Sequence, residues 1–449
     1  MNLVHYVGIA GGGVSALAQF HAMGGGQASG SDRSFDRGEA LRTREQLERL
    51  GIRIFSQDAG ALALRPDYLV ASGAVEADVA DVKEARARKI EVRHRAEELA
   101  RVVAERKAIA VAGTSGKSTV AAMVFAILSA AKLDPSIITG GELVELKERG
   151  LLGNAWRGKG EWLVIEADES DGTLVRYSPS ISVILNVSKD HKEIFEIRNL
   201  FREFKSRSKI CLVSADPDLA DLRTGSVVFG QGGQLSAEEV KLGPRSSEFW
   251  IGRTRFTLPC PGAHNVENAL AAVAAAQAAE VPLEAAAQAL SHFRGVARRF
   301  ETIGETRGVL VIDDFAHNPA KVEAAIRAAK LGGRRVLAVF QLHGYAPARF
   351  LKNEFVDAFA RALGPNDRLW MPEIYYAGGS VTRDISAKDV ADAVRARGRR
   401  ARFALDRNGI PAAIAAEASQ GDVVLSMGAR DPSLPEFARK IFSHLQSGR

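Results

Sequence analysis

A short glycine-rich segment that contains one lysine constrains the fold of this chain more than any other feature. Residues 113–119 read Gly-Thr-Ser-Gly-Lys-Ser-Thr, between an apolar run at residues 108–112 and a helix-like stretch at residues 120–130. Such a loop, between a buried strand and a helix, points backbone N–H groups and the positive end of the helix dipole at an anion. Lys117 would then reach the outer phosphates of a nucleotide, and Ser118 would bind Mg²⁺.

The segment differs from the complete phosphate-binding pattern, because a valine stands at position 111, where that pattern has its first glycine. The plain alternative is a glycine-rich turn between a strand and a helix. The lysine and the serine stand at their expected places and in the expected context, which favours a phosphate site.

Strand-like apolar runs alternate with helix-like segments along the whole chain, a pattern that predicts parallel α/β sheets. Three such series begin with the apolar runs at residues 4–9, 108–112 and 309–312. The chain has 449 residues, more than one hydrophobic core usually organises. We therefore predict an α/β protein of three domains, at residues 1–104, 105–297 and 298–449.

Composition narrows the class of protein. Hydrophobic residues make up 46% of the chain and charged residues 25%, the proportions of a soluble globular protein. No apolar run reaches the roughly 20 residues of a membrane span, and the first residues lack the pattern of a signal peptide. Two cysteines, Cys211 and Cys260, provide neither a disulfide framework nor a metal-binding spacing. We expect a cytoplasmic protein.

The net charge of +6 would suit acidic ligands such as nucleotides. Charges of both signs are interspersed, however, so a well-solvated surface is the favoured interpretation of the excess. The basic run at residues 395–402 has no aromatic residues between its arginines. We therefore expect no nucleic-acid partner.

Polar side chains end two further strand-like runs of the central series. Residues 166–171, Glu-Ala-Asp-Glu-Ser-Asp, hold four carboxylates, and Mg²⁺ prefers carboxylate and phosphate oxygens. A solvated acidic loop is the alternative. Residues 186–191, Asn-Val-Ser-Lys-Asp-His, follow the next strand. A histidine is usually structural, but at the carboxyl end of a parallel strand, beside a Mg²⁺ site, it becomes a candidate ligand.

Two later segments could contact the base and the ribose of a nucleotide. Residues 262–270 contain a histidine and two asparagines whose side chains can hydrogen-bond a purine, although an ordinary helix start would look similar. Residues 313–319, Asp-Asp-Phe-Ala-His-Asn-Pro, end another strand. An aspartate there often holds a ribose hydroxyl, and the alternative is a helix cap before proline.

A first glycine run, Gly8-x-x-Gly11-x-Gly13, precedes Asp32 by about twenty residues. The glycine spacing is reversed from that of dinucleotide-binding turns, so the indication of NAD is weak. We expect a ligand that carries phosphate at this turn, and tight packing of strand on helix is the alternative.

Taken in order, these segments resemble those of the Mur ligase family. The family has a glycine-rich first domain for the UDP part of its substrate, and then five motifs: Gly-Thr-x-Gly-Lys-[Ser/Thr], a strand-terminal Glu, Asn…Asp-His, His-Asn-x-x-Asn-Ala and Asp-x-x-His. All occur here in that order, between Gly8 and His317. The resemblance covers nearly the whole chain, and the ordered set is far more specific than any one motif.

Within the family, residues 29–32 and 166–171 resemble the corresponding segments of the enzymes in two branches. One adds L-alanine to UDP-N-acetylmuramate, and the other re-attaches recycled murein tripeptide; residues 340–343 are closer to the first. The resemblance implies a Rossmann-like N-terminal domain, a central P-loop-like ATPase domain and a Rossmann-like C-terminal domain.

The activity implied by the resemblance is ATP-dependent joining of an amino acid, with L-alanine as the first candidate, to the carboxylate of UDP-N-acetylmuramate through an acyl phosphate. That reaction belongs to peptidoglycan biosynthesis, and so to cell wall biogenesis, cell shape and cell division. The implied cofactors are ATP and Mg²⁺, and Mn²⁺ stays open as the metal. The partners are these small molecules, with no membrane partner, and the chain is expected to be a monomer or a weak dimer.

The matching positions imply roles for individual residues. The catalytic residues are Lys117, Glu166 and His191, and the metal ligands are Ser118, Glu166 and His191. ATP would contact Gly113, Thr114, Ser115, Gly116, Lys117, Ser118, Thr119, Asn265, Asn268, Arg299 (or its neighbour Arg298) and Asp314, with His317 beside it. The UDP-sugar would contact Gly8, Gly11, Gly12, Gly13, Ser15, Asp32 and Ser72, and the amino acid His343 and Arg349.

Three departures from the family pattern bear on these roles. The L-alanine branch usually has His-Arg-Tyr in the loop expected to meet the amino acid, whereas residues 343–345 are His-Gly-Tyr. Arg349 could supply the missing guanidinium, the natural clamp for a carboxylate. A Thr-His pair in the phosphate loop is Thr-Ser here, and a late Gly-Ala-Gly is Gly-Ala-Arg, where Arg430 could compensate.

Alternatives remain within and outside the family. The ligase could use another amine or peptide, as in murein tripeptide recycling, or another carboxylate. In a different class, the chain could be a nucleotide-binding regulatory protein without ligation. Lys205 stands fourteen residues after His191, near the place where several Mur ligases carry a carbamylated lysine. A solvated helix lysine is the favoured interpretation.

Overall fold

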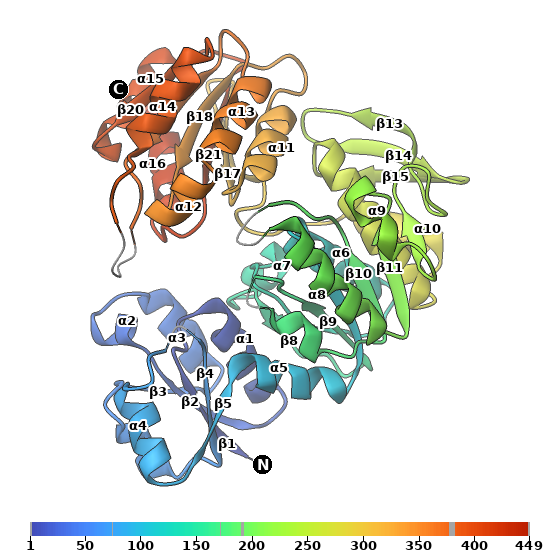
Figure 1. The fold of residues 1–449 in the computed structure, drawn as a ribbon, viewed down its shortest axis with the longest axis vertical. Coiled ribbons are helices and arrows are strands. Elements are labelled where there is room, and N and C mark those ends of the chain that lie inside the picture. The colour runs from blue at the N-terminus through green and yellow to red at the C-terminus, as the bar shows by residue number, and fades with distance from the viewer. Residues whose placement is uncertain (1, 74, 171, 190–192, 377–381, 448–449) are drawn as a thin grey trace. The chain divides into compact units, whose positions relative to one another are not determined.

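The computed structural model describes residues 2–73, 75–170, 172–189, 193–376 and 382–447, and it confirms a mixed α/β fold built on parallel sheets (Figure 1). The chain divides into two compact units. One comprises Met1–Val187, Lys192–Ala237 and Asn268–Val296, and the other Ser188–His191, Glu238–Glu267 and Ala297–Arg449. No helix of the described residues is long and apolar enough to cross a membrane.

The first unit begins with a five-stranded, fully parallel sheet in the order β3-β2-β1-β4-β5. Its strands are β1 (Leu3–Val7), β2 (Gln27–Ser31), β3 (Arg53–Phe55), β4 (Tyr68–Ala71) and β5 (Glu91–His94). Its helices are α1 (Gly12–Met23), α2 (Arg33–Asp36), α3 (Leu41–Arg49), α4 (Ala80–Ala87) and α5 (Arg95–Ala104), with a 3₁₀ turn η1 (Gly60–Leu64). Seven consecutive residues of α1, 14–20, are buried, because α1 packs on this sheet and also on β7 and β8 of the next one.

The second sheet of this unit has seven strands in the order β12-β11-β10-β6-β9-β7-β8. The strands are β6 (Lys107–Ala112), β7 (Ser136–Ile138), β8 (Ala155–Trp156), β9 (Trp162–Glu166), β10 (Ile181–Ile184), β11 (Ile210–Ser214) and β12 (Val227–Phe229). The accompanying helices are α6 (Lys117–Ala130), α7 (Val144–Glu148), η2 (Thr173–Arg176), α8 (Ile194–Ser206), η3 (Pro217–Leu222), α9 (Ala263–Ala278) and α10 (Leu283–Ser291). Only β8 runs antiparallel to its neighbour in this sheet.

The central position of β6 follows from its composition. All its residues after Lys107 are small or β-branched apolar residues and are fully buried, as expected of a parallel strand covered on both faces. It pairs in parallel with β9 on one side and with β10 on the other. The carboxyl ends of β6, β9 and β10 therefore deliver the glycine-rich loop, Glu166 and Asn186 to one edge of the sheet.

The second unit contains a three-stranded antiparallel sheet and a six-stranded sheet in the order β16-β17-β21-β18-β19-β20. The strands are β13 (Glu238–Leu242), β14 (Ser247–Ile251), β15 (Thr254–Leu258), β16 (Glu301–Thr306), β17 (Val309–Asp314), β18 (Val336–Gln341), β19 (Arg368–Pro372), β20 (Ala401–Ala404) and β21 (Val423–Gly428). The helices are α11 (Pro319–Ala329), α12 (Tyr345–Phe350), α13 (Lys352–Ala362), α14 (Ala387–Ala396), η4 (Arg407–Gly409), α15 (Ile410–Glu417) and α16 (Leu434–Ser447). The sequence patterns did not predict the antiparallel sheet.

Helices cover both faces of the six-stranded sheet (Figure 1). The alternation of side chains along β17 shows this directly. Leu310 and Ile312 pack with α11, α13 and α14, whereas Val309 and Val311 pack with α15 and α16. With two buried faces, these strands read as continuous apolar runs, which is why the sequence located them.

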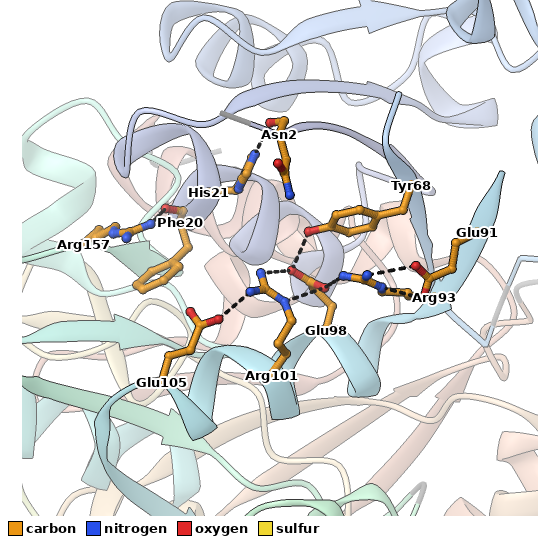
Figure 2. Close-up of polar contacts among 10 residues, drawn as sticks. All are labelled: Asn2, Phe20, His21, Tyr68, Glu91, Arg93, Glu98, Arg101, Glu105 and Arg157. Atoms are coloured by element: carbon orange, nitrogen blue, oxygen red, sulfur yellow. Dashed lines mark hydrogen bonds and ion pairs between the residues drawn. The ribbon is translucent and has the colours of Figure 1, made fainter. Parts of the chain in front are cut away.

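A buried carboxylate ties α5 to the first sheet (Figure 2). The side chain of Glu98 on α5 is 3% exposed. It accepts hydrogen bonds from the Tyr68 hydroxyl at 3.0 Å, from Arg101 at 2.7 Å and from Arg93 at 3.3 Å. Burial of Glu98 favours its neutral form, but its hydrogen bonds and the arginine charges outweigh burial and lower the pKa of this carboxyl.

Replacing Glu98 with glutamine should lower the free energy of unfolding at pH 7 by about 1–3 kcal/mol, because hydrogen bonds to a charged group are lost inside the protein. A carboxyl whose pKa is lowered by folding stabilises the fold above its unfolded pKa of about 4.3, and this stabilisation disappears as the pH falls through the folded pKa. Urea unfolding should therefore show a difference from the parent that narrows below about pH 4.

The matched control is Glu91→Gln. Glu91 binds the same Arg93 but is mostly exposed, so its replacement should leave the urea midpoint near that of the parent. Equal destabilisation by both variants would contradict the role assigned to Glu98.

Candidate functional site

The loop after β6 has a backbone that two glycines make possible. Gly113 has φ +142° and Gly116 φ +87°, conformations that other residues rarely adopt. A Cβ atom at Gly113 would lie 2.9 Å from the Cβ of Leu185, and one at Gly116 would overlap the Asn268 side chain. The loop therefore passes close to β10 and α9, and the N-terminus of α6 begins directly behind it at Lys117.

Asn186, just after β10, fixes the conformation of this loop. Its Oδ1 accepts from the Thr114 hydroxyl at 3.0 Å and from the Ser115 N–H at 2.9 Å, and its Nδ2 donates to the Ser115 carbonyl at 3.1 Å. One amide side chain thus satisfies donors and acceptors of two loop residues and fixes the conformation of the loop.

Lys117 is held between the loop and the acidic segment after β9. Its ammonium donates to the Gly113 carbonyl at 2.8 Å and to Glu169 at 2.7 Å, and Asp168 lies 3.7 Å away. Burial disfavours the charged lysine, but Glu169 and Asp168 outweigh burial and raise the pKa of Lys117. Burial also raises the pKa of Glu169. The loop thus contains a charged ammonium in a mostly buried place, which a phosphate oxygen would share with Glu169.

Glu166 ends β9 beside a second glycine pair. The hydroxyl of Thr139 and the N–H of Gly140, at 3.1 Å, both donate to its Oε1. A Cβ atom at Gly141 would lie 2.8 Å from the Cβ of Ser118. The loop after β7 therefore contacts both Glu166 and Ser118 and places them at the same edge of the sheet.

These residues are compatible with a Mg²⁺ ion that also binds phosphates. Within the part of the chain that the structure describes, no three His, Cys, Asp or Glu side chains converge on a ready-made metal site. Mg²⁺ usually takes only one or two carboxylates and completes its shell with water and substrate phosphate. Glu166 and Ser118 meet that requirement, while the third predicted ligand, His191, lies outside the described residues.

The glycine-rich turn after β1 is the site predicted for the UDP-sugar. Gly8 has φ +79°, and a Cβ atom there would lie 3.0 Å from Val75 and 4.0 Å from the hydroxyl of Ser72. Asp32 accepts from the Ala10 N–H at 2.9 Å and so orders the turn. No side chain caps the N-terminus of α1, where Gly11 is the capping residue and Gly12 and Gly13 the first helical residues.

Two residues beside this turn had no predicted role. Arg95 lies against Gly13, where a Cβ atom would come within 2.9 Å of its Cδ, and its charge also lowers the pKa of Asp168. Arg95 therefore links the first turn electrostatically to the acidic segment after β9. Asn154 donates to the Gly12 carbonyl at 2.8 Å and to the Ser15 hydroxyl at 3.0 Å. Ser15 thus lies where the two sheets of this unit meet.

In the second unit, several predicted residues gather at the carboxyl edge of the six-stranded sheet. Asp314, at the end of β17, accepts from the N–H groups of Phe300 and Ala316, both at 2.7 Å. Burial raises the pKa of Asp314 to about 6. The Arg299 guanidinium lies 4.7 Å from the centre of the Phe315 ring, and the rings of His317 and His343 are 5.7 Å apart.

The structure distinguishes Arg299 from its neighbour Arg298. Arg298 donates to Asp313 at 3.0 Å and to the carbonyls of Gly428 at 2.7 Å and Ala429 at 3.1 Å. These contacts join β17 to the end of β21, so Arg298 has a structural task. Arg299 instead lies over the Phe315 ring, and its charge acts on Asp314, the residue predicted to contact the ribose.

In the loop predicted to meet the amino acid, the backbone conformation at position 344 suits glycine rather than the arginine of the family pattern. Gly344 has φ +70° and ψ 131° at the start of α12, a conformation that would strain an arginine there. Arg349, the proposed substitute, is half-exposed and pairs with Asp384 while donating to the Thr382 carbonyl at 3.1 Å. A substrate carboxylate would therefore have to share Arg349 with Asp384.

The remaining predicted residues divide between the units. Asn268 lies beside the phosphate loop, while Asn265, one helical turn earlier on α9, donates to the Pro261 carbonyl at 2.8 Å. Lys205 donates to the carbonyls of Leu222, at 2.7 Å, and Thr224. The Lys205 side chain thus lies against the turn that follows η3.

Some residues of this edge escaped the sequence patterns, although signals existed. The glycine pair 140–141 directly follows an apolar run, just as the phosphate loop does. Asn186 begins a recognised motif, but the spacing of residues could not predict that its side chain hydrogen-bonds the backbone of the loop. Lys117 and Glu169 are 52 positions apart in the sequence, and only folding brings their side chains into contact.

Three family models match consecutive parts of the chain. They are described as the Mur ligase family catalytic domain at residues 3–107, the Mur ligase middle domain at residues 111–276, and the Mur ligase glutamate ligase domain at residues 298–430. The matches cover most of the 449 residues and follow the order in which the motifs occur.

Curated relatives and solved structures agree with these matches. A UDP-N-acetylmuramate–L-alanine ligase of Geobacter sp. (strain M21) is 36% identical, over 95% of this chain and 94% of its own length. One from Myxococcus xanthus is 35% identical, over 97% and 95%. The crystal structure of the UDP-N-acetylmuramate–alanine ligase of Thermotoga maritima matches over 100% of both chains, with a TM-score of 0.83 and 27% identity. A murein peptide ligase of Psychrobacter arcticus shares the fold, with a TM-score of 0.67 and 22% identity.

The ion pair in the phosphate loop generates a prediction. Lys117→Ala should reduce ATP turnover by at least roughly 100-fold, as expected when a group that offsets phosphoryl charge is removed. It should also lower the thermal midpoint, because Glu169 stays buried without its cation. The double variant Lys117→Ala/Glu169→Gln should regain the midpoint but not the turnover. Full ATP turnover in folded Lys117→Ala would contradict the phosphate-loop assignment.

Proposed function

This chain belongs to the Mur ligase family, and from that premise we propose that it joins L-alanine to the carboxylate of UDP-N-acetylmuramate at the expense of ATP. The observation that carries the proposal is the phosphate loop with its charged, mostly buried Lys117, beside Glu166 and Ser118. The similarity to L-alanine ligases over nearly the full length of both chains supports the choice of substrates.

Each bond change follows from the chemistry of the substrates. A carboxylate oxygen of UDP-N-acetylmuramate attacks the γ-phosphorus of ATP, and ADP leaves, which forms an acyl phosphate. The uncharged amine of the amino acid then attacks the acyl carbon, phosphate leaves, and the nitrogen loses a proton to give the amide. The protein mostly positions the reactants and offsets charge in such a reaction.

The first unit would bind the phosphates of ATP. The N–H groups of residues 113–119 and the N-terminus of α6 would surround the phosphates, and Lys117 would neutralise oxygen charge. Asn186 fixes the loop backbone, and Asn268 lies beside the loop. Glu166, Ser118 and His191 would hold Mg²⁺, which when bound supplies further charge neutralisation. A related MurF ligase of Thermotoga maritima was crystallised with ADP and shares the fold, with a TM-score of 0.60.

The turn after β1 would bind the diphosphate of the UDP-sugar. Gly8, Gly11, Gly12 and Gly13 allow close approach to the uncapped N-terminus of α1, and Asp32 orders the turn. The neighbouring Arg95 adds a cation beside Gly13. Of the other residues predicted to contact the UDP-sugar, Ser72 lies near Gly8. Ser15 accepts a hydrogen bond from Asn154.

In the second unit, Asp314 is assigned to the ATP ribose and Arg299 to a phosphate, with Asn265 assigned to adenine. His343 and Arg349 are the candidates for the amino acid. The proposed domains remain 1–104, 105–297 and 298–449. The setting that goes with this function is the cytoplasm and the building of peptidoglycan, and hence cell shape and division, by a monomer or a weak dimer.

Phosphate release from ATP should require UDP-N-acetylmuramate and an amino acid together. We expect UDP-N-acetylmuramate to saturate below about 1 mM, in the usual range of KM values. L-alanine should give the highest kcat/KM, with L-serine and glycine tested beside it because of Gly344. Release with a murein tripeptide but with none of these amino acids would move the chain to the recycling branch, and ATP binding without any release would favour a regulatory protein.

The metal assignment has its own test. Glu166→Gln should raise the Mg²⁺ concentration for half-maximal activity by about tenfold or more, and His191→Ala should raise it less, because a carboxylate holds a hard cation more strongly than an imidazole does. Glu142→Gln serves as the control, since Glu142 follows the same glycine pair but is exposed and paired with Lys147. Mg²⁺ titrations that coincide for all three variants and the parent would remove Glu166 from the metal site.

A further inference from the structure

A second cationic site lies at the amino-terminal edge of the seven-stranded sheet, opposite the edge that carries the phosphate loop. A pocket of about 670 Å³ is lined there by Arg106, Lys107, Arg157, Lys159 and Lys209, among other residues. Lys107 is the first residue of β6, and Lys209 immediately precedes β11. Because these strands are parallel, their amino ends share one edge, which none of the residues discussed above for ATP or UDP-sugar occupies.

The charges of the pocket are not balanced. Its two carboxylates already have partners: Glu161 binds Lys107 at 2.8 Å, and Glu105 binds Arg101 at 2.6 Å. Among the residues that the structure describes, no carboxylate lies within ion-pair distance of Arg106, Arg157, Lys159 or Lys209. Four cations therefore line one open pocket without a carboxylate of the described residues within ion-pair distance, and the five cations of the pocket outnumber its two carboxylates.

Two of these cations are held in place close to each other. The guanidinium of Arg106 donates through one nitrogen to the Gly160 carbonyl at 3.0 Å and to the Ser136 hydroxyl at 3.3 Å. Arg157 donates through one nitrogen to the Phe20 carbonyl at 3.3 Å. Both guanidinium carbons lie near the Phe20 ring, at 5.6 and 4.8 Å from its centre, and Figure 2 shows Arg157 beside Phe20.

Holding like charges together is unfavourable unless something compensates. Burial, and after it the charge of Arg106, lowers the pKa of Arg157, and the charge of Glu105 offsets only part of this shift. The arginines bond the backbone through one nitrogen each, so their other N–H groups are available in a fixed orientation. Two oriented guanidinium groups, with lysines around them, can donate hydrogen bonds to the oxygens of a phosphate group.

We propose that this pocket binds a small phosphate-bearing anion with more than one negative charge, of the size of pyrophosphate. Its volume is in the range of small-molecule sites, roughly 300–1,000 Å³. No aromatic side chain is among its lining residues, so it offers no stacking platform for the bases of a single-stranded nucleic acid. The site is separate from the ATP site, and the proposal does not depend on the ligase function.

Calorimetric titration of the full chain with pyrophosphate, in the presence of saturating ADP, would test this proposal. ADP occupies the phosphate loop, so binding that persists must lie elsewhere. We expect saturable binding that weakens as salt rises from 50 to 200 mM, as charge attraction does. Arg106→Gln/Arg157→Gln should weaken this binding at least roughly tenfold, through the loss of charge-assisted hydrogen bonds.

A second pair of variants guards against a folding defect. Lys159→Gln/Lys209→Gln removes two cations whose side chains make no hydrogen bond within the described residues, and it should also weaken pyrophosphate binding. The matched control is Arg44→Gln/Arg49→Gln on the exposed surface of α3, which changes the net charge equally and should leave binding unchanged.

Three results would overturn the proposal. Binding that disappears with saturating ADP would place pyrophosphate in the phosphate loop. Equal affinity in the pocket variants and the control would remove the pocket as the site. Displacement of pyrophosphate by a short RNA or DNA duplex at much lower concentration would mean that the edge takes a nucleic acid instead.

Discussion

The parallel pairing of β6 with β9 and β10 is the constraint on which the candidate site depends. The register places Val111 of β6 opposite Glu166 of β9, and Ala112 opposite Ile184 of β10. The glycine-rich loop, Glu166 and Asn186 therefore leave the sheet at the same level. A one-residue slip of β6 would turn its buried side chains to the opposite face of the sheet, so packing on both faces fixes the register.

The same edge depends on a charge that the protein keeps in a mostly buried place. A lysine with a side chain only 15% exposed would tend to lose its proton, yet Glu169 and Asp168 keep Lys117 charged. The lysine offsets only part of the cost of burying Glu169, since burial still raises the pKa of that carboxyl. The neighbouring carboxylates thus keep the ammonium of Lys117 protonated before any phosphate arrives.

The two edges of the central sheet offer anions different chemistry. At the carboxyl edge, backbone N–H groups and a helix N-terminus surround a single lysine, an arrangement that tolerates little change in shape. At the amino edge, two arginines held by hydrogen bonds and three lysines line an open pocket. Helix α5, with Arg95 at its first residue and Ala104 at its last, runs from the turn after β1 toward that pocket.

The sequence by itself determined the local features. Apolar runs located β6, β9, β10, β17, β18 and β21, because strands buried on both faces must be continuously apolar, and glycines marked the turns that need unusual backbone angles. The ordered motifs also indicated the family and the three-domain α/β fold. The antiparallel strands β13–β15 were missed, since β13 is exposed throughout and gives no apolar signal. The tertiary structure alone decided the pairing of Lys117 with Glu169, of Gly13 with Arg95 and of Ser15 with Asn154. These contacts join residues far apart in the chain, and sequence periodicity reports only which face of an element is buried, not which distant side chain lies against it.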